Sequence, residues 1–233
     1  MKTLGIIPAR GGSKRFPRKN IAPFLGRPAI AATIEAARDS GCFERCVVST
    51  EDPEIAAIAA EFGGDVDARP AEFATDEARL SDVCLDLLDR EFARGRRYDA
   101  ICVLYAPAVL RDAGDIRATC DLLEPGVCNF SQAVCRYDHY AHQALKLGAG
   151  GRIEPMWPDL ADCCAKELPP LVCGNGSTYA ALVPAFRASG GSFVGPLMKA
   201  HEMPRWKSVD IDYPDDLVLA EFFASRYAHA VAG

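Results

Sequence analysis

The sequence contains no apolar run long enough to cross a membrane. A membrane-spanning helix needs about 20 apolar residues in succession, and none of the apolar stretches approaches that length. The chain also reaches a charged loop at Arg10 after one short apolar stretch, which leaves no room for the apolar segment and cleavage site of a signal peptide. We therefore expect a cytoplasmic protein that does not insert into a membrane.

The ten cysteines lack the spacing of a zinc-binding or disulfide-rich protein. No C-x-x-C pair occurs, and residues such as Cys102 and Cys135 lie inside apolar runs. Thiols stay reduced in the cytoplasm, so we expect most of these side chains to be buried as small hydrophobic groups. The adjacent Cys163 and Cys164 have no evident role.

Positive charge is in the minority. The chain has 26 Lys and Arg against 32 Asp and Glu, a formal net charge of -6, which argues against nonspecific binding to nucleic acid. Internal repeats and low-complexity tracts are also missing. A length of 233 residues suits a single domain, 1–233, with a well-buried core.

The stretch IIPARGGSKRFPRKN, Ile6–Asn20, concentrates small residues and positive charge. The apolar run Thr3–Pro8 predicts a buried strand. The residues after it are small enough for the backbone to approach a ligand closely: Ala9, Gly11, Gly12 and Ser13. Cations accompany them: Arg10, Lys14, Arg15, Arg18 and Lys19. Backbone N–H groups with adjacent cations form an anion site suited to a polyphosphate.

Two well-known phosphate loops do not match this stretch. A Walker A loop ends in Gly-Lys-Ser/Thr, and the dinucleotide fingerprint needs a third glycine that opens a helix. On charge and glycine content alone, a solvated basic turn after an edge strand remains an alternative.

Strand and helix patterns alternate along the chain. Predicted strands after Thr3–Pro8 are Cys46–Val48, Asp65–Ala68, Tyr98–Tyr105, Phe130–Cys135, Tyr179–Val183 and Lys207–Ile211. Predicted helices open at Pro28 and end before Gly41, then cover Pro53–Phe62, Leu80–Phe92, Asp112–Leu123 and Pro214–Ala228. This order predicts an α/β fold with a mostly parallel sheet, helices on both faces, and ligands at the carboxyl ends of the strands.

The alternation breaks between about residues 137 and 175. This stretch is rich in Gly, Pro and His and is too long for an ordinary loop. We expect an insertion in the domain. His139 and His142 alone are weak evidence for a metal site, because no carboxylate or thiolate ligand stands at a fitting spacing.

The stretch Ile6–Asn20 closely resembles the signature of the cytidylyltransferases that activate sialic acid and related nonulosonic acids as CMP-sugars. The resemblance covers nearly the whole chain and is also dense at Val47–Asp52, Arg69–Asp76 and Ser208–Asp212. Tyr105 and Met156-Trp157-Pro158 resemble the pseudaminic acid branch. The resemblance implies a nucleotide-diphospho-sugar transferase fold and CMP transfer from CTP for surface-glycan or flagellin glycosylation.

The resemblance also implies partners and residue roles. Arg10 and Lys14 would be catalytic and hold the CTP phosphates, with backbone contacts from Ala9, Gly11 and Gly12. Asn20 and Arg69 would lie near the nucleotide; from spacing alone, Arg69 could equally pair with Glu72 or Asp76 on the surface. The sugar would meet Lys146, Asn175 and Tyr179. The inserted segment would form a homodimer through His139, His142, Trp157 and Leu160.

Asp210 and Asp212 in SVDIDYPDD are candidates to bind Mg²⁺. In a strand they would alternate with Ile211 and project from one face, and carboxylates held close together repel unless a cation lies between them. The resemblance implies the same metal pair. In the alternative interpretation, Asp212 complements the N-terminus of the helix at Pro214 and Asp210 is a solvated strand residue.

Several positions depart from the family pattern. Ala106–Val109 lacks the hydroxyl of a Pro-Thr-Ser/Ala-Pro motif, and cations are missing at Gln143, Ala165 and Cys173. Since an arginine normally recognises the sugar carboxylate, either Lys146 and Lys166 replace it or the sugar differs. Two alternatives therefore stay open, a nucleotide-binding paralogue without turnover and an enzyme for another acidic sugar such as ketodeoxyoctonate.

Overall fold

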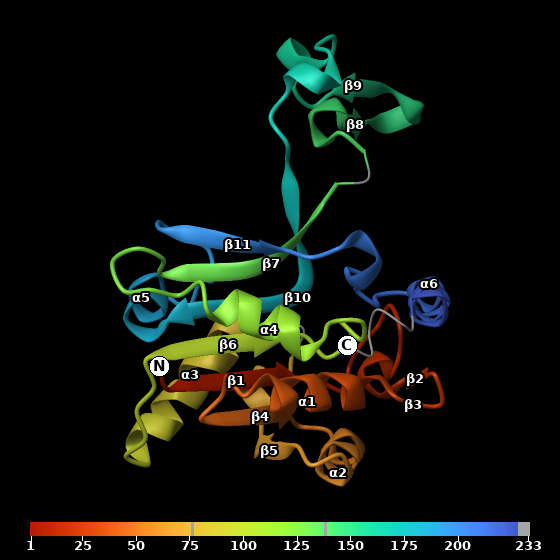
Figure 1. Cartoon of the computed structure of the whole chain (residues 1–233). Helices are drawn as coiled ribbons and strands as arrows, with labels where there is room; N and C mark the ends of the chain where they lie inside the picture. Colours follow the sequence, from red (N-terminus) through yellow and green to blue (C-terminus); the bar gives the residue numbers. More distant parts are fainter. Residues whose placement is uncertain (76, 138, 228–233) are drawn as a thin grey trace.

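The computed structural model describes residues 1–75, 77–137 and 139–227 and has a seven-stranded sheet at its centre (Figure 1). The strands of this sheet are β1 (Thr3–Pro8), β4 (Arg45–Thr50), β5 (Asp65–Ala68), β6 (Ala100–Leu104), β7 (Phe130–Arg136), β10 (Val172–Leu182) and β11 (Met198–Glu202). Two hairpins lie outside it, β2 (Pro23–Phe24) with β3 (Arg27–Pro28) and β8 (Leu145–Leu147) with β9 (Ile153–Pro155). The α-helices are α1 (Ala29–Ser40), α2 (Pro53–Glu61), α3 (Leu80–Ala93), α4 (Ala113–Cys120), α5 (Val183–Ala188) and α6 (Pro214–Arg226).

The sheet is mostly parallel, as predicted. Its order is β11-β7-β10-β6-β1-β4-β5, and only β10 runs antiparallel to its two neighbours among these described strands. The parallel strands β6, β1 and β4 therefore end at one edge, where the loop after β1 begins.

Alternating side chains of β1 build the core on both faces of the sheet. Ile7 packs with α1, α2 and α4 on one face, whereas Leu4 and Ile6 pack with α3 and α5 on the other. This period of two follows from the pleat of a strand. A third apolar cluster joins α6 to the segment that precedes it, through Val209 and Ile211.

The helix starts follow the local sequence signals. The Asp52 side chain accepts hydrogen bonds from two backbone N–H groups at the start of α2. Asp112 and Asp115 form a reciprocal capping box on α4. Gly41 ends α1 in the left-handed conformation, with φ of 66°. The predicted end of the last helix, Ala228, lies outside the described residues.

The strand predicted at Lys207–Ile211 is wrong. Lys207 closes a short 3-10 turn (η7, Arg205–Lys207), and residues 208–211 have no regular structure. The alternating burial of Val209 and Ile211 comes from packing against α6 and not from pairing in the sheet. The edge strand is instead β11, which the sequence analysis missed because three of its five residues are exposed.

Residues 139–171 form an arm that projects away from the sheet and carries the β8–β9 hairpin (Figure 1). Strand β10 begins at Val172, earlier than the predicted Tyr179, and a register shift between Gly174 and Tyr179 divides it into two parts. Leu147 and Ile153 of the arm are 79% and 63% exposed.

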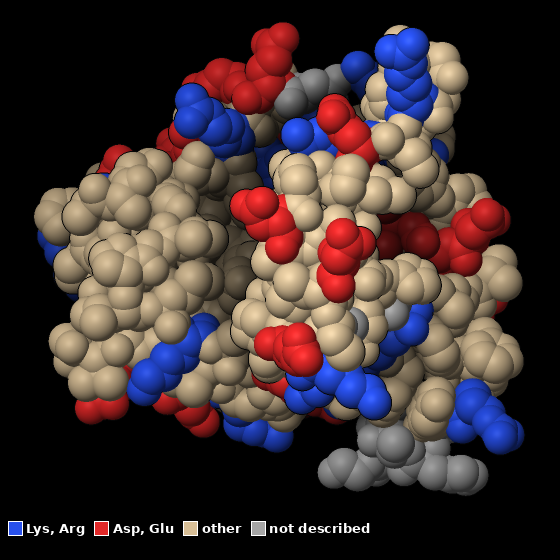
Figure 2. Space-filling view, turned by 90° about the horizontal axis from the view of Figure 1, so that it is seen from above, with Lys and Arg blue, Asp and Glu red and all other residues tan. Residues whose placement is uncertain are grey.

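Seen from above, charges of both signs are scattered over a broad surface of other residues (Figure 2). No described helix has the length and apolar content to cross a membrane.

Candidate functional site

Hydrogen bonds fix the position of the loop after β1 at the carboxyl edge of the sheet. The Ala9 N–H donates to the Ser49 carbonyl at 3.0 Å, and the Asn20 side-chain amide donates to the Arg10 carbonyl at 3.0 Å. Asn20 is buried, so this hydrogen bond ties the loop to the protein interior. The Gly11 N–H donates to the Glu51 carboxylate at 2.8 Å. A backbone amide of the loop therefore already binds one anionic group.

The two glycines of this loop have different surroundings. A Cβ atom on Gly11 would lie 2.3 Å from Oδ2 of Asp52, whereas a Cβ on Gly12 would meet no atom within 4 Å. Gly11 is therefore needed for the close approach of the loop to the start of α2. The space at Gly12 remains open.

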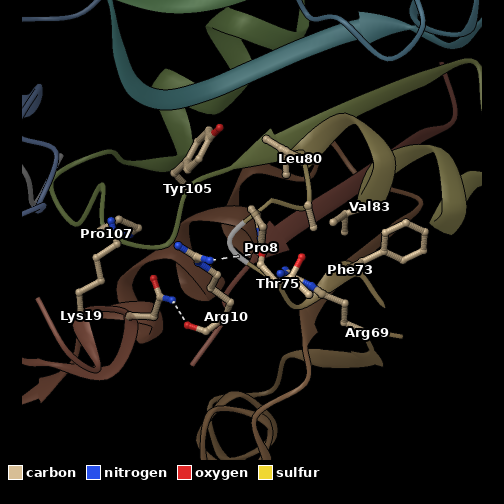
Figure 3. Close-up of a pocket in the computed structure, with 12 residues that line it drawn as sticks. Pro8, Arg10, Lys19, Arg69, Phe73, Thr75, Leu80, Val83, Tyr105 and Pro107 are labelled. Carbon is tan, nitrogen blue, oxygen red and sulfur yellow. Dashed lines mark hydrogen bonds between the residues drawn. The ribbon is translucent and has the colours of Figure 1, made fainter. Parts of the chain in front are cut away.

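A pocket of about 270 Å³ lies beside the loop (Figure 3). Its lining includes Pro8, Arg10, Lys19, Arg69, Phe73, Thr75, Tyr105 and Pro107. The Arg10 guanidinium reaches into the centre of the view and donates to the Thr75 carbonyl at 3.4 Å. Burial raises the pKa of Tyr105 to about 12, so its hydroxyl stays protonated at neutral pH.

Arg69 is buried beneath this pocket. Its guanidinium donates to the Ser49 carbonyl at 2.7 Å, and burial lowers its pKa. The alternative of a surface pair with Glu72 is therefore wrong, and Asp76 lies outside the described residues. Arg69 is placed to line the pocket and to brace the end of β4.

A smaller hollow of about 150 Å³ gathers the cations of the loop. Its lining is Arg10, Ser13, Lys14, Arg15, Lys19 and Asn20. Lys14 is exposed. Four cationic side chains around one hollow, next to backbone amides, make a site for a multiply charged anion.

The structure pairs some of these cations in ways that the sequence analysis missed. Lys19 Nζ lies 2.7 Å from Asp212 Oδ1, and Arg15 lies 2.6 Å from Asp212 Oδ2. Arg18 instead pairs with Asp52 and Glu54 at the start of α2. In the sequence, the spacing of four residues between Arg15 and Lys19 was the available signal of a shared partner. That partner, Asp212, is far away in the sequence.

Asp210 and Asp212 lie in the irregular segment before α6 and not in a strand. Crowding by surrounding protein atoms raises the pKa of Asp210 to about 6 even though solvent reaches its side chain; Lys19 opposes the shift and the Asp212 charge adds to it. Burial would raise the pKa of Asp212, but hydrogen bonds and charge from Lys19 and Arg15 outweigh burial and lower it. Lys19 and Arg15 therefore act to lower the pKa of both carboxylates, and the charge of Asp212 raises the pKa of Asp210.

The backbone shows how closely Asp210 is held. A Cβ on Gly176 would lie 2.3 Å from Asp210 Oδ2, and Gly176 has a positive φ of 66°. The N–H groups of Asp212 and Tyr213 donate to Asp216, so Asp216 caps α6. The alternative role of Asp212 as a complement to the helix start is thus wrong, because its carboxylate faces Lys19 and Arg15.

The donor set at Asp210 and Asp212 fits Mg²⁺ in part. Among residues 1–75, 77–137 and 139–227, no three His, Cys, Asp or Glu side chains gather to hold a metal by themselves. Two carboxylates suit a Mg²⁺ ion that takes its remaining ligands from water and a substrate phosphate. The adjacent cationic hollow is where such a phosphate would lie.

The three residues expected at the sugar occupy different places. Asn175 is buried, donates to Ser208 at 3.0 Å, and has a buried Oδ1 without a hydrogen-bond partner in the described structure. Tyr179 is half-buried and meets the Tyr105 ring edge-on at 5.7 Å. Lys146 lies on the arm, where its register partner is Glu154, and is not brought to the loop of its own chain.

A larger groove of about 890 Å³ lies beside Asp210. Its lining includes Tyr137, His139, Gln143, Trp157, Cys173 and Arg205. Gln143 and Cys173, two of the departures from the family pattern, therefore face this groove. The Ala106 and Ala108 side chains are instead buried in the core. The Ala165 side chain lies outside the described part of the structure.

Comparisons with known proteins show the family of this chain. A family model described as cytidylyltransferase matches residues 4–94. The chain is 30% identical over 222 residues to a pseudaminic acid cytidylyltransferase of Campylobacter jejuni, covering 95% of each chain. It is 29% identical over 231 residues to a CMP-N,N'-diacetyllegionaminic acid synthase of Legionella pneumophila, again covering 95% of each.

A solved structure shares the fold. The structure of a CMP:2-keto-3-deoxy-manno-octonic acid synthetase complexed with CTP superposes with a TM-score of 0.71 at 15% identity, covering 97% of this chain and 99% of that one. This confirms the predicted nucleotide-diphospho-sugar transferase fold. With the full-length sequence similarity, it shows that the chain belongs to the CMP-nonulosonate cytidylyltransferase family.

Proposed function

We propose that this protein transfers CMP from CTP to an acidic nonulosonic sugar of the pseudaminic or sialic type and releases pyrophosphate. The observation that carries the proposal is the contact of Lys19 with Asp212, which joins the cationic loop to the acidic pair at one edge of the sheet. Both curated relatives described above are named for activation of such acids.

The triphosphate would occupy the cationic hollow beside Arg10 and Lys14. The backbone at Gly12 is open to a phosphate, because a Cβ there would meet no atom within 4 Å, whereas the Gly11 N–H already donates to Glu51. The cytidine would extend into the adjacent pocket lined by Arg69 and Tyr105. The two cavities share Arg10, Lys19 and Asn20, so one ligand would span both.

The reaction would be an attack on the α-phosphate of CTP. The anomeric hydroxyl of the sugar forms a new P–O bond, loses its proton, and the bond to the pyrophosphate group breaks. Arg10 and Lys14 would stabilise the charge that accumulates on the phosphate oxygens. Most of the rate enhancement would come from positioning and charge neutralisation.

Asp210 and Asp212 would hold the Mg²⁺ ion. When bound, the metal would neutralise phosphate charge and orient the α-phosphate. Arg15 and Lys19 neutralise Asp212 in this structure. Metal binding would therefore compete with two ion pairs, and the cations that it displaces would lie next to the triphosphate.

The sugar would lie in the groove beside Asp210, near Tyr179. We also propose a homodimer, in which the arm of one copy covers the groove region of another. The support is the exposure of apolar arm side chains, among them Trp157 at 43% and Leu145 at 55%. In such an assembly, Lys146 of one copy would reach the sugar bound by another. The reaction would take place in the cytoplasm, where CTP is available.

Pyrophosphate release tests this proposal. CTP, ATP, GTP and UTP would each be incubated with nine-carbon and eight-carbon acidic sugars. We expect release with CTP and a nine-carbon acid. Release only with an eight-carbon acid would favour ketodeoxyoctonate, and folded protein that releases none with any pair would favour the binding paralogue.

A further inference from the structure

Cys135 and Cys173 lie opposite each other on neighbouring strands. They are register partners in the antiparallel pair of β7 and β10, and their sulfur atoms are 3.7 Å apart. Neither is in a disulfide. Sulfur atoms at this distance are in van der Waals contact.

The backbone geometry suits a bond between these two sulfurs. Directly opposed residues of antiparallel strands have Cα atoms roughly 4.5 to 5.5 Å apart. Disulfides join residues whose Cα atoms are about 4.4 to 6.8 Å apart. A bridge between Cys135 and Cys173 therefore needs side-chain rotation and little movement of the strands.

Small reagents can reach this pair. Both cysteines line the groove beside Asp210, and Cys173 is half-buried. Cys135 is 9% exposed, whereas Cys84 and Cys102 are fully buried in the core. Cys164 is exposed and Cys163 is half-buried, but both lie on the arm.

The two cysteines also lie where the arm joins the sheet. β7 leads into the arm and β10 leads out of it (Figure 1). Two residues after Cys173, Asn175 donates to Ser208, and the following Gly176 touches Asp210. A change at Cys173 therefore reaches the backbone that packs on Asp210.

We propose that Cys135 and Cys173 are a reversible disulfide site that controls the groove beside Asp210. With hydrogen peroxide as oxidant, one thiol is oxidised to a sulfenic acid and one water leaves. The second thiol then attacks that sulfur, the S–S bond forms, and a second water leaves. Overall, two thiols and one peroxide give one disulfide and two waters, and a dithiol reductant reverses the bond.

The consequence for turnover rests on the proposed function. Forming the bond rotates both side chains, changes the surface that Cys135 and Cys173 present to the groove, and ties β7 to β10 two residues before Asn175. We expect oxidation to lower kcat/KM for the sugar at least several-fold and to leave the affinity for CTP, measured without Mg²⁺, unchanged, because the cationic hollow shares no described lining residue with the groove.

Peptide mapping tests the bond itself. Full-length protein carrying Cys163→Ser and Cys164→Ser would be treated with hydrogen peroxide, alkylated, digested and analysed by mass spectrometry. We expect a cross-linked peptide pair containing Cys135 and Cys173 that dithiothreitol releases. Cys173→Ser should abolish it, and the matched variant Cys42→Ser should retain it. Complete alkylation of both thiols after oxidation would overturn the site.

Measurements of turnover test the proposed regulation of the groove. Each protein would be compared with itself before and after oxidation, so that an effect of the substitution on the basal rate does not matter. We expect a dithiothreitol-reversible loss in the parent protein and no change in Cys173→Ser. A cross-link without loss of kcat/KM would overturn the regulatory role. Absence of turnover in the reduced parent would refute the proposed function and leave the mapping result intact.

Discussion

Lys19 and Asp212 are 193 positions apart in the chain, and Lys19 Nζ lies 2.7 Å from Asp212 Oδ1. This contact brings the segment before the last helix to the loop after the first strand. Both side chains are largely covered, at 21% and 27% exposure, so solvent screens the pair less than it screens a surface ion pair. The candidate phosphate site and the candidate metal site are therefore one connected site.

Lys14→Ala should weaken CTP binding. Lys14 lines the cationic hollow from an exposed position, so its loss should not disturb the fold. Removing a charge-assisted contact to phosphate costs about 1.5 to 3 kcal/mol, or roughly 10- to 150-fold in Kd. Calorimetry with CTP measures this. Lys199→Ala, an exposed lysine on β11, is the control; equal affinities in both variants would show that Lys14 belongs to a solvated turn.

Gly11→Ala should destabilise the protein more than Gly12→Ala. A methyl group at Gly11 collides with Asp52, which caps α2, whereas the same group at Gly12 meets open space. Loss of a helix cap costs about 1 kcal/mol. Urea unfolding of the two variants compares them directly. If Gly12→Ala were equally destabilised, the close approach at Gly11 would not be the cause.

Asp210→Asn and Asp212→Asn should each lower Mg²⁺-dependent turnover by orders of magnitude. The amides remove negative charge that would hold the metal. Melting temperatures should change far less, and Asp215→Asn, an exposed residue in the first turn of α6, is the matched control for charge. Full activity in both variants, or full activity of the parent protein in excess chelator, would leave the loop to act without a metal.

The pKa of Asp210 predicts how stability depends on pH. The folded protein raises this pKa from 3.8 to about 6, so between these values the folded state keeps a proton that the unfolded state has lost. The Asp210 contribution should therefore make the free energy of unfolding fall as pH rises from about 4 to 6. Asp210→Asn should be more stabilising, relative to the parent, at pH 7 than at pH 4.5. Urea unfolding at both pH values measures this, and a constant difference would contradict it.

Local signals in the sequence predicted most of the fold. The buried run Thr3–Pro8, the cap at Asp52 and the alternation of strands with helices depend on nearby residues, and the structure has them. The irregular segment at 208–211 was misread as a strand because Val209 and Ile211 alternate with polar residues whichever partner buries them. Lys19 as the partner of Asp212 was missed because a contact between distant segments leaves no local pattern.

Substitution in the arm should test the dimer. Ile153→Glu places a charge on an apolar arm residue that is 63% exposed within one chain, so it should leave a folded monomer intact and break an interface formed by the arm. Light scattering should show a dimer for the parent protein and a monomer for the variant. Glu154→Gln, on the same strand, is the control. A parent protein that is monomeric at every concentration would contradict the dimer.

Direct detection of the product tests the central claim. The protein would be incubated with CTP, Mg²⁺ and pseudaminic or sialic acid, and the mixture followed by phosphorus NMR and mass spectrometry. The account predicts loss of the triphosphate signals, a new phosphodiester signal, and a mass equal to CMP joined to the sugar with loss of water. Folded protein that binds CTP and yields no such species with any nonulosonic acid would contradict it.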